Sequence, residues 1–324
     1  NPKVGIIVLS YNSEDHIERC LKSIISQRYS NVLLYVVDNA SQDRTREKIS
    51  QFSSIELIKS DTNTGYAGGN NIGMRKALKD GCDAVFLLND DAYIEESTIE
   101  LLVTFAEQSE HLGAVQPLLL LHQDKRSINS CGNSLHYLGF GYAIGYKQRV
   151  TDGSSFKTDI AVATGASVLF TREALVDVGL FDQTFFLYHE DIDLSWRMRL
   201  RGWSIALAPE ARAYHDYSFS KSIQKYYYME RNRILFLLKN FSLRYLVLIA
   251  PMFFITELGL SLYSLKNGFA KERIQAWSYL MKRSNRKELM LSRRVIQKSR
   301  KVKDRELLGY LTDEITAQEI DSSL

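Results

Sequence analysis

The sequence is poor in cysteine and proline, and it lacks the phosphate-binding motifs of several large protein classes. Its 3 cysteines show no CxxC pair and no zinc-like spacing, so free thiols in a reducing, cytosolic environment are expected for Cys20, Cys82 and Cys131. Only 4 prolines occur in 324 residues, which favours a compact, regular fold. The Gly-Lys-Ser/Thr step of a P-loop and the GxGxxG fingerprint are both absent, which argues against a nicotinamide-dependent dehydrogenase.

Charge is distributed unevenly along an otherwise ordinary globular composition. Apolar residues make up 45% of the chain and charged residues 24%. The net charge is +3, yet the stretch Lys266–Arg305 holds 14 Lys and Arg against 3 Asp and Glu. This stretch carries +11 and the rest −8, which predicts an acidic or neutral catalytic body with a basic tail. No recognised nucleic-acid-binding module accompanies the tail, so nucleic acid is not an expected partner.

Short apolar runs alternate with helical patterns in the N-terminal part. Runs of strand length occur at four places, Val4–Leu9, Leu33–Val37, Ile55–Ile58 and Ala84–Leu88. The first run is too short for a secretory signal segment. Helical patterns separate the runs near 17–25, 43–52 and 72–78, with a glycine-rich loop expected at 63–71. This order predicts parallel β-α-β units and therefore an α/β fold with a mostly parallel sheet.

Polar clusters follow three of these predicted strands, namely Ser10-Tyr11-Asn12, Asp38-Asn39 and Asn89-Asp90-Asp91. Ligands bind beyond the carboxyl ends of open parallel sheets, so all three clusters are expected to face one crevice. The acidic cluster suits Mg²⁺ or Mn²⁺, but it also fits a solvated turn. Asp38 can accept a hydrogen bond from a nucleotide base or ribose, or serve as a turn residue. The glycine-rich loop offers N–H groups to an anion, or is simply flexible.

The second half is less regular. Loops and short strands are expected over Gly132–Gly145, and a strand over Ile160–Phe170, around Thr164-Gly165. The segment Asp191–Arg201 alternates as a strand would, yet its i,i+4 apolar pairs and the following glycine favour a helix.

Two further clusters carry candidate chemistry. Glu190, Asp191 and Asp193 place three carboxylates within four positions, which suits a general base or, equally, an acidic first helical turn. Arg231 lies among tyrosines, a combination that suits phosphate or sugar contacts or ordinary core packing. His215 stands alone, and a lone histidine is more often packed or exposed than a ligand.

In their order along the chain, these pieces resemble the family 2 glycosyltransferases, which have the GT-A fold. The matching segments are VLSYN at 8–12, VDNAS at 37–41, NTGYAGGN at 63–70, LNDD at 88–91, TGA at 164–166, FD at 181–182 and FLYHEDIDL at 186–194. They extend from about Val4 to about Arg233. The resemblance is greatest to the rhamnosyltransferase and galactofuranosyltransferase branch, which builds bacterial or archaeal surface glycans.

The resemblance implies roles for residues at matching positions. A nucleotide-sugar site is implied for Ser10, Tyr11, Asn12, Asp38, Asn39, Gly65, Asn70, Asn89, Asp90, Thr164, Gly165 and Arg231. Within this set, Asp38 is expected to contact the base. Asp91 is the expected ligand of Mg²⁺ or Mn²⁺, with His215 as a second ligand. Asn89 stands where the family's DXD motif has its first Asp, so a single direct carboxylate ligand is expected.

The implied activity is inverting transfer of a sugar from a UDP-, dTDP- or GDP-linked donor. Asp191 is the expected base and Glu190 is expected to orient the base or the acceptor. The acceptor would be a hydroxyl group of a lipid-linked or polysaccharide glycan. A nucleotide-sugar-binding scaffold protein without turnover is the alternative, and the Glu190-Asp191 pair argues against it because a binder needs no base there.

The C-terminal region is expected to be helical and membrane-associated. We expect a catalytic domain over 1–233 and a helical region, apolar and then basic, over 234–324. The apolar stretch Tyr245–Leu265 has one charge, Glu257, and its 21 residues make it borderline for a membrane span. Pro251 and the basic residues that follow favour an interfacial helix pair on anionic lipid, at the cytoplasmic side of the membrane. A buried core helix with a solvated basic helix is the alternative, and a homo-oligomer stays possible.

Overall fold

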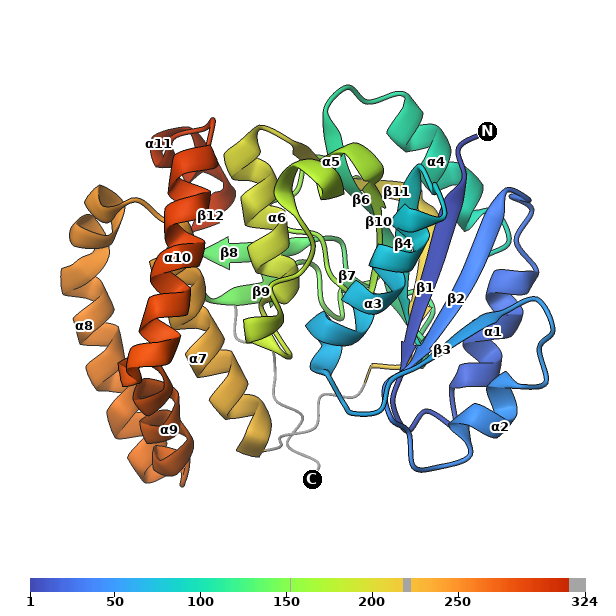
Figure 1. Ribbon diagram of the computed structural model, residues 1–324. Helices are drawn as coiled ribbons and strands as arrows, with labels where there is room; N and C mark the ends of the chain where they lie inside the picture. Colours follow the sequence, from blue (N-terminus) through green and yellow to red (C-terminus); the bar gives the residue numbers. More distant parts are fainter. Residues whose placement is uncertain (152, 218–222, 315–324) are drawn as a thin grey trace.

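The four apolar runs of the N-terminal part form parallel strands of one sheet, as expected. The structure is a computed structural model that describes residues 1–151, 153–217 and 223–314. The elements follow in the order β1 (Val4–Ser10), α1 (Ile17–Ile25), β2 (Val32–Asp38), α2 (Thr45–Ile49), β3 (Glu56–Lys59), α3 (Gly65–Lys79) and β4 (Ala84–Asn89). β1 pairs in parallel with β2 and β4, and β2 pairs with β3 (Figure 1). β1 and β4 are buried on both faces, which explains their unbroken apolar sequence.

Later segments extend the sheet beyond β4. β10 (Ser167–Thr171) runs antiparallel to β4 and to β6 (Leu112–Leu121), whereas β11 (Ser204–His215) runs parallel to β6. β5 (Ala92–Ile94) pairs with β11 and β7 (Ile128–Ser130) with β6. Within the described ranges this makes a nine-stranded sheet of order β3-β2-β1-β4-β10-β6-β11-β5, with β7 beside β6. The predicted α/β class with a mixed, mostly parallel sheet is confirmed.

Of three predictions for the second half, one is corrected and two are confirmed. The predicted strand over 160–170 is too long, because β10 begins only at Ser167, which pairs with Leu88 near the end of β4. The residues before it turn across the end of the sheet. The predicted short strands at 132–145 and the helix after Asp191 are present, as β8 (Asn133–His136), β9 (Gly141–Ala143) and α6 (Glu190–Arg201).

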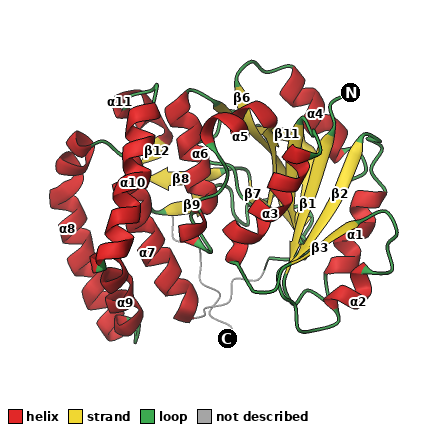
Figure 2. Cartoon of the chain, viewed as in Figure 1, coloured by secondary structure: helices red, strands yellow, loops and turns green. Residues whose placement is uncertain are grey.

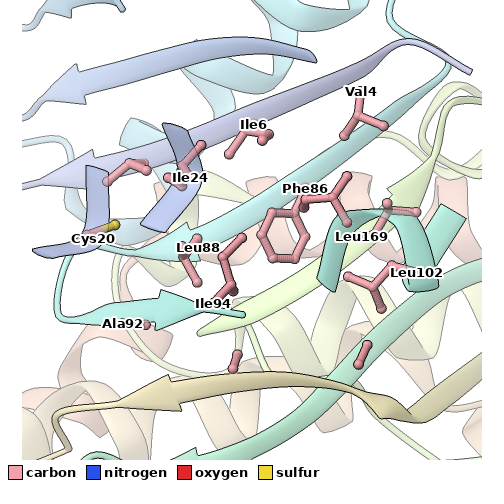
Figure 3. Packing of buried hydrophobic residues seen from close by; sticks show 14 of the residues in the cluster. Val4, Ile6, Cys20, Ile24, Phe86, Leu88, Ala92, Ile94, Leu102 and Leu169 are labelled. Carbon is pink, nitrogen blue, oxygen red and sulfur yellow. The ribbon is translucent and has the colours of Figure 1, made fainter. Parts of the chain in front are cut away.

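Apolar side chains fill a layer on each face of the sheet. One layer packs β1 and β4 against α1 and α4 (Thr98–Glu107), and it includes Ile6, Phe86, Cys20 and Leu102 (Figure 3). The opposite layer packs the same strands against α3 and α6, and it includes Ile7, Val85, Met74 and Met198. Each fully buried side chain of this kind contributes about 1.5–3 kcal/mol to folding. All three cysteines are free thiols, as predicted.

The glycine-rich segment is helical from Gly65 onward, which corrects the prediction of a loop at 63–71. α3 begins at Gly65 and includes the remaining glycines. Two of them face β1 at close range, since a Cβ on Gly69 would overlap Leu9 and one on Gly73 would overlap Ile7. The side chain of Asn39 holds the start of this helix, because its Oδ1 accepts the Thr64 N–H at 2.9 Å. Gly69 and Gly73 therefore allow α3 to pack closely against β1.

A helical layer covers one side of this core. It contains α7 (Ile223–Asn240), α8 (Leu243–Lys266), α9 (Ala270–Met281) and α10 (Arg283–Ser299). α6 lies between this layer and the sheet (Figures 1 and 2). The chain ends with α11 (Asp304–Leu307), η2 (Leu308–Tyr310) and β12 (Leu311–Thr312), which pairs with β8. The expected domain boundary at 233/234 falls inside α7, which is continuous. Residues 315–324 of the predicted C-terminal region lie outside the described residues.

The close contact of α3 with β1 makes a testable prediction. An added methyl group at Gly73 would overlap the γ-methyl of Ile7, a buried and conformationally stiff side chain. We expect Gly73→Ala to lower the free energy of unfolding by about 1–3 kcal/mol in urea denaturation. Gly259→Ala on α8 is the matched control, because nothing lies within 4 Å of its added Cβ. An equal loss in both variants would contradict the packing argument.

Candidate active site

The carboxyl ends of β1, β2 and β4 bring the predicted polar clusters to one edge of the sheet. The parallel register pairs Ser10 with Asp38, and Leu9 with Asn89. This is the arrangement expected for a ligand crevice at the ends of parallel strands.

Two adjoining cavities lie at this edge. One has a volume of about 520 Å³ and we name it the Tyr228 cavity, and the other has about 280 Å³ and is named the Asp191 cavity. Both are lined by Tyr66, Asn89 and Leu187, so these side chains lie between the two cavities.

The predicted site residues divide into three groups. Those at the Tyr228 cavity are Tyr11, Asn39, Gly65, Asn89 and Asp90. Those at the Asp191 cavity are Asn89, Thr164, Gly165, Glu190, Asp191 and His215. Those that line neither are Ser10, Asn12, Asp38, Asn70, Asp91 and Arg231. Asp91 nevertheless contacts His215, as described below, and so belongs to the same edge.

The carboxylate of Asp38 is already engaged within the protein. Asp38 is fully buried, and its Oδ2 accepts a hydrogen bond from Nε of Arg46 at 2.5 Å. Its Oδ1 accepts the Ser41 N–H at 3.3 Å. The guanidinium belongs to a side chain that is 43% exposed. Asp38 lines neither cavity, so its expected contact with a nucleotide base stays a prediction.

Asn70 and Arg231 line neither cavity, and their expected contacts with the nucleotide sugar stay predictions. Asn70 is buried within α3, and its Nδ2 donates to the carbonyl oxygen of Tyr66, one turn earlier in the same helix. Arg231 is also buried, and its Nη2 donates to the carbonyl oxygens of Thr184 and Phe185 at 2.7 and 2.8 Å. Both side chains therefore satisfy backbone groups of the protein.

Two acceptor atoms face each other after β4. His215 Nε2 lies 3.0 Å from Asp91 Oδ1, and the other ring nitrogen, Nδ1, lies 3.1 Å from Asn129 Oδ1. Because an amide oxygen only accepts, Nδ1 carries a proton. Nε2 donates to the carboxylate when it too is protonated, and presents a lone pair that repels the carboxylate when it is not. A cation between the two atoms relieves their repulsion. Two adjacent octahedral ligands with bonds of about 2.1 Å lie about 3.0 Å apart, so the pair fits Mg²⁺ or Mn²⁺.

The surroundings of this pair also fit a hard cation. Asn89 Oδ1 is a buried oxygen without a hydrogen-bond partner in the described part of the chain, and its side chain contacts the His215 ring. No group of three or more His, Cys, Asp or Glu side chains gathers among the described residues. Magnesium and manganese sites of this kind use few protein ligands and complete their shell with water and phosphate oxygens.

Asp90 and Asp91 have opposite electrostatic surroundings. The Asp90 carboxylate accepts hydrogen bonds from the Ser13 hydroxyl and from the Tyr11 N–H, and so supports the turn after β1. Burial and the neighbouring Asp91 raise the pKa of Asp90 to about 6. Burial also disfavours the charge on Asp91, but its contact with His215 outweighs burial and lowers the pKa of Asp91.

Glu190 and Asp191 stand at the first turn of α6 and face the Asp191 cavity. Asp191 Oδ2 accepts the Gly165 N–H at 3.0 Å, and Oδ1 accepts the Ile192 N–H at 2.8 Å. Burial raises the pKa of Asp191 above its ordinary value. Glu190 Oε2 has no hydrogen-bond partner among the described residues, and burial together with Asp191 raises the pKa of Glu190 well above its usual range.

The third carboxylate of the acidic cluster is structural. Asp193 is fully buried and accepts hydrogen bonds from Arg197 Nε at 2.8 Å, Lys239 Nζ at 2.9 Å and Asn240 Nδ2 at 2.8 Å. Arg197 and Lys239 neutralise Asp193, and the bonds from Lys239 and Asn240 tie α6 to α7. Of the three acidic residues, only Glu190 and Asp191 face the cavity.

Sequence reasoning missed several residues that line the cavities. They are Tyr66, Asn129, Tyr142, Tyr146, Tyr188, Tyr217, Lys225 and Tyr228. Tyr66 lies inside the motif NTGYAGGN at 63–70, in which only Gly65 and Asn70 are predicted to be site residues. Asn129 belongs to β7, and no local pattern marks it as the partner of His215, which lies 86 residues further along the chain.

The electrostatics of Glu190 predict a pH-dependent effect on stability. A raised pKa in the folded state stabilises the wild type below pH 4.5, the ordinary value, and this stability is lost as pH rises toward the folded value. Glutamine does not titrate, so we expect Glu190→Gln to unfold at a higher temperature than wild type at pH 8 and at nearly the same temperature as wild type at pH 4. Thermal denaturation at both pH values measures this. Glu100→Gln, at an exposed position on α4, should show no such trend.

Comparison with protein families matches residues 2–233 to the family described as "Glycosyltransferase like family 2". The chain is 28% identical over 240 residues to the low-salt glycan biosynthesis hexosyltransferase Agl10 of Haloferax volcanii, covering 72% of this chain and 74% of that protein. It is 23% identical over 256 residues to the dTDP-rhamnosyl transferase RfbF of Shigella flexneri, covering 74% and 81%. It is 24% identical over 236 residues to the N-acetylglucosaminyl-diphospho-decaprenol L-rhamnosyltransferase of Mycobacterium tuberculosis, covering 66% and 76%.

Solved structures of similar fold include the mannosyltransferase PcManGT of Pyrobaculum calidifontis in complex with GDP-Man and Mn²⁺. The TM-score is 0.55 at 15% identity, covering 91% of this chain and 86% of that chain. GalNAc-T7 with UDP, GalNAc and Mn²⁺ gives a TM-score of 0.61 at 14% identity, covering 75% and 48%. At such identities the likeness establishes the fold, which is GT-A. Since the family match spans most of the chain, this protein belongs to glycosyltransferase family 2 and is a glycosyltransferase of the hexosyltransferase type.

Proposed function

We propose that the protein is an inverting glycosyltransferase that uses a UDP-, dTDP- or GDP-linked sugar to extend a lipid-linked or polysaccharide acceptor in surface glycan synthesis. One observation carries this proposal: a carboxylate of raised pKa, Asp191, and a cation-compatible pair, Asp91 and His215, lie at the same edge of the sheet, around adjoining cavities. The names of the Shigella and Mycobacterium relatives support a nucleotide-linked donor and a lipid-linked acceptor as classes.

In this proposal the donor nucleotide occupies the Tyr228 cavity. Phe186 and Tyr228 both line it and stack with ring centroids 5.2 Å apart, which makes a flat apolar wall. The donor diphosphate then lies toward Asn89, the side chain shared by both cavities. Asp91 and His215 would hold Mg²⁺ or Mn²⁺, which neutralises the charge of the leaving diphosphate. The Mn²⁺ present in the PcManGT and GalNAc-T7 structures supports a divalent cation.

The acceptor hydroxyl is placed in the Asp191 cavity. Asp191 takes its proton while the oxygen forms a bond to the anomeric carbon, from the face opposite the diphosphate. The bond from the anomeric carbon to the diphosphate oxygen breaks, and its electron pair leaves with the diphosphate. The raised pKa makes Asp191 a stronger base than an ordinary aspartate, and the Gly165 and Ile192 N–H groups orient it. Burial and Asp191 raise the pKa of Glu190, and in its protonated form Glu190 can donate a hydrogen bond to a sugar oxygen.

The base assignment gives the first functional prediction. We expect Asp191→Asn to bind the donor within threefold of wild type, because Asp191 lines the cavity away from the nucleotide, and to lose transfer by about 10²–10⁴-fold. Nucleoside diphosphate release with and without acceptor, and calorimetric donor binding, measure the two effects. Asp61→Asn, at an exposed turn, is the control. Near-normal transfer by Asp191→Asn would refute the base, and binding without turnover by wild type would favour the scaffold alternative.

Membrane association is proposed for the outer face of α8. Among the described residues, α8 is the one helix with the length and apolar composition of a membrane span, yet only 11% of its apolar window is buried. The side chains that are at least 61% exposed are Leu243, Val247, Leu248, Phe254, Ile255, Leu258, Leu262 and Leu265. An exposed apolar surface of this extent marks an interaction site, and it disfavours the alternative of a buried core helix.

The one acidic residue of this stretch supports an interfacial position. Glu257 is 7% exposed and faces inward, where it pairs with Arg233 of α7 and with Arg273 of α9. Glu230 pairs with the same Arg273. Separating these buried charges to let α8 cross a bilayer would cost about 3–5 kcal/mol per broken pair. With the basic stretch 266–305 next to it, α8 is better suited to lie on an anionic, cytoplasmic membrane surface.

Vesicle flotation without detergent tests this surface. We expect wild type to float with vesicles that contain anionic lipid, and the double variant Leu248→Glu/Leu258→Glu to stay in the soluble fraction, because two charges on the outer face oppose insertion. Val176→Glu is the matched control, since Val176 is an exposed apolar residue, at 68%, on α5 (Arg172–Val178). A wild type that is wholly soluble in the presence of these vesicles would remove the membrane proposal.

A further inference from the structure

The segment just before Glu190 has a strained backbone. Phe186 has φ 62° and ψ −60°, and the Leu187 N–H donates to the carbonyl oxygen of Phe185 at 2.7 Å. Phe186 is therefore the centre of a γ-turn with positive φ, the rare and strained form of this turn. Tyr188 and His189 also have positive φ, at 67° and 69°. Residues other than glycine avoid these conformations, so such a segment persists only where its surroundings hold it.

Asn232 of α7 holds three carbonyl groups of this segment. Its side chain is fully buried, and Nδ2 donates to the carbonyl oxygens of Phe185, Leu187 and Tyr188 at 2.8, 2.8 and 2.7 Å. The Phe185 oxygen is the same atom that accepts the hydrogen bond of the γ-turn. One amide group therefore ties together both sides of the strained turn.

Arg231 completes this clamp from the preceding position of α7. Its Nη2 donates to the carbonyl oxygens of Thr184 and Phe185, and its Nε donates to Asn232 Oδ1 at 2.9 Å. The last bond fixes which end of the Asn232 amide faces the segment. The guanidinium also lies 4.7 Å from the ring of Tyr279 on α9, so the clamp is braced by the C-terminal helical layer.

The clamped segment connects the two cavities to the base. Phe186 and Leu187 line the Tyr228 cavity, and Leu187 and Tyr188 line the Asp191 cavity. The segment leads directly into Glu190 and Asp191, the first residues of α6. Neither clamping side chain lines a cavity. Their hydrogen bonds reach the site through the backbone of 184–189, and the Arg231 guanidinium also lies 5.0 Å from the ring of Tyr228 in the donor wall.

We propose that Asn232 and Arg231 are positioning residues for sugar transfer. By holding 184–189 in its strained form, they set the distance and direction between the donor wall at Phe186 and the base Asp191. This inference rests on the proposed function. It gives Arg231 a positioning role in place of the direct contact with the nucleotide sugar that the sequence predicts.

The test replaces Asn232 with an isosteric residue. Asn232→Asp keeps the volume but removes both N–H donors and sets a carboxylate against three carbonyl oxygens. We expect amide hydrogen exchange of the full-length protein to rise at least tenfold in peptides covering 183–191, and to stay within twofold in β1 and β4. We also expect kcat for transfer to fall at least tenfold. The ratio of donor hydrolysis to transfer should rise, because a misplaced base no longer favours the acceptor hydroxyl over water. Arg231→Met should show the same pattern more weakly.

Leu237→Ala is the matched control, because Leu237 is buried on α7 and its hydrocarbon side chain has no hydrogen bond to donate to the clamped carbonyl groups. It should lower the melting temperature while kcat stays within threefold. Unchanged local exchange or unchanged kcat in Asn232→Asp would overturn the proposal, as would an equal loss of kcat in Leu237→Ala at the same loss of melting temperature. If wild type transfers no sugar from any donor, the proposed function fails first and the positioning role falls with it. The exchange result then reports on the clamp alone.

Discussion

The hydrogen bond from the Gly165 N–H to the Asp191 carboxylate joins the two halves of the site. The same turn also binds the end of β4, because the Ala166 carbonyl oxygen accepts the Asn89 N–H at 2.9 Å. The Tyr66 hydroxyl donates to the Gly165 carbonyl oxygen at 2.7 Å and closes the arrangement against α3. The end of β4 and the start of α6 are thus held by successive peptide groups of one turn. Transfer in a single displacement requires this kind of fixed separation.

Charge is balanced in the helical layer and left unbalanced at the cavities. Asp193 is surrounded by Arg197 and Lys239, and Glu257 by two arginines, so these buried carboxylates hold helices together. Asp90 and Glu190 form no ion pair with a Lys or Arg side chain of the described residues, and burial raises the pKa of each. Sites that bind a charged substrate or a metal ion commonly keep groups whose ionisation is unfavourable in the free protein, at some cost to stability.

α7 links α8 and its exposed apolar face to the site through consecutive residues. Asn232 points to the strained segment before Glu190, and Arg233, the next residue, pairs with Glu257 of α8. A rotation of α7 would disturb both contacts, because adjacent residues of a helix point in directions about 100° apart on a rigid cylinder. The helix that anchors the outer apolar face therefore also supports the backbone of the site.

The sequence by itself determined the α/β class, the family and the strand ends that form the crevice. These features are local: a buried parallel strand is an unbroken apolar run, and its following polar residues must lie at the edge of the sheet. The tertiary structure alone decided which polar side chains face the cavities. Asn70 and Arg231 bond to the backbone, Glu257 turns inward to two arginines, and Asn129 orients His215 from far along the chain. Such partners meet only after packing, because hydrogen bonding and charge neutralisation depend on distance in space and leave no periodic pattern in the chain.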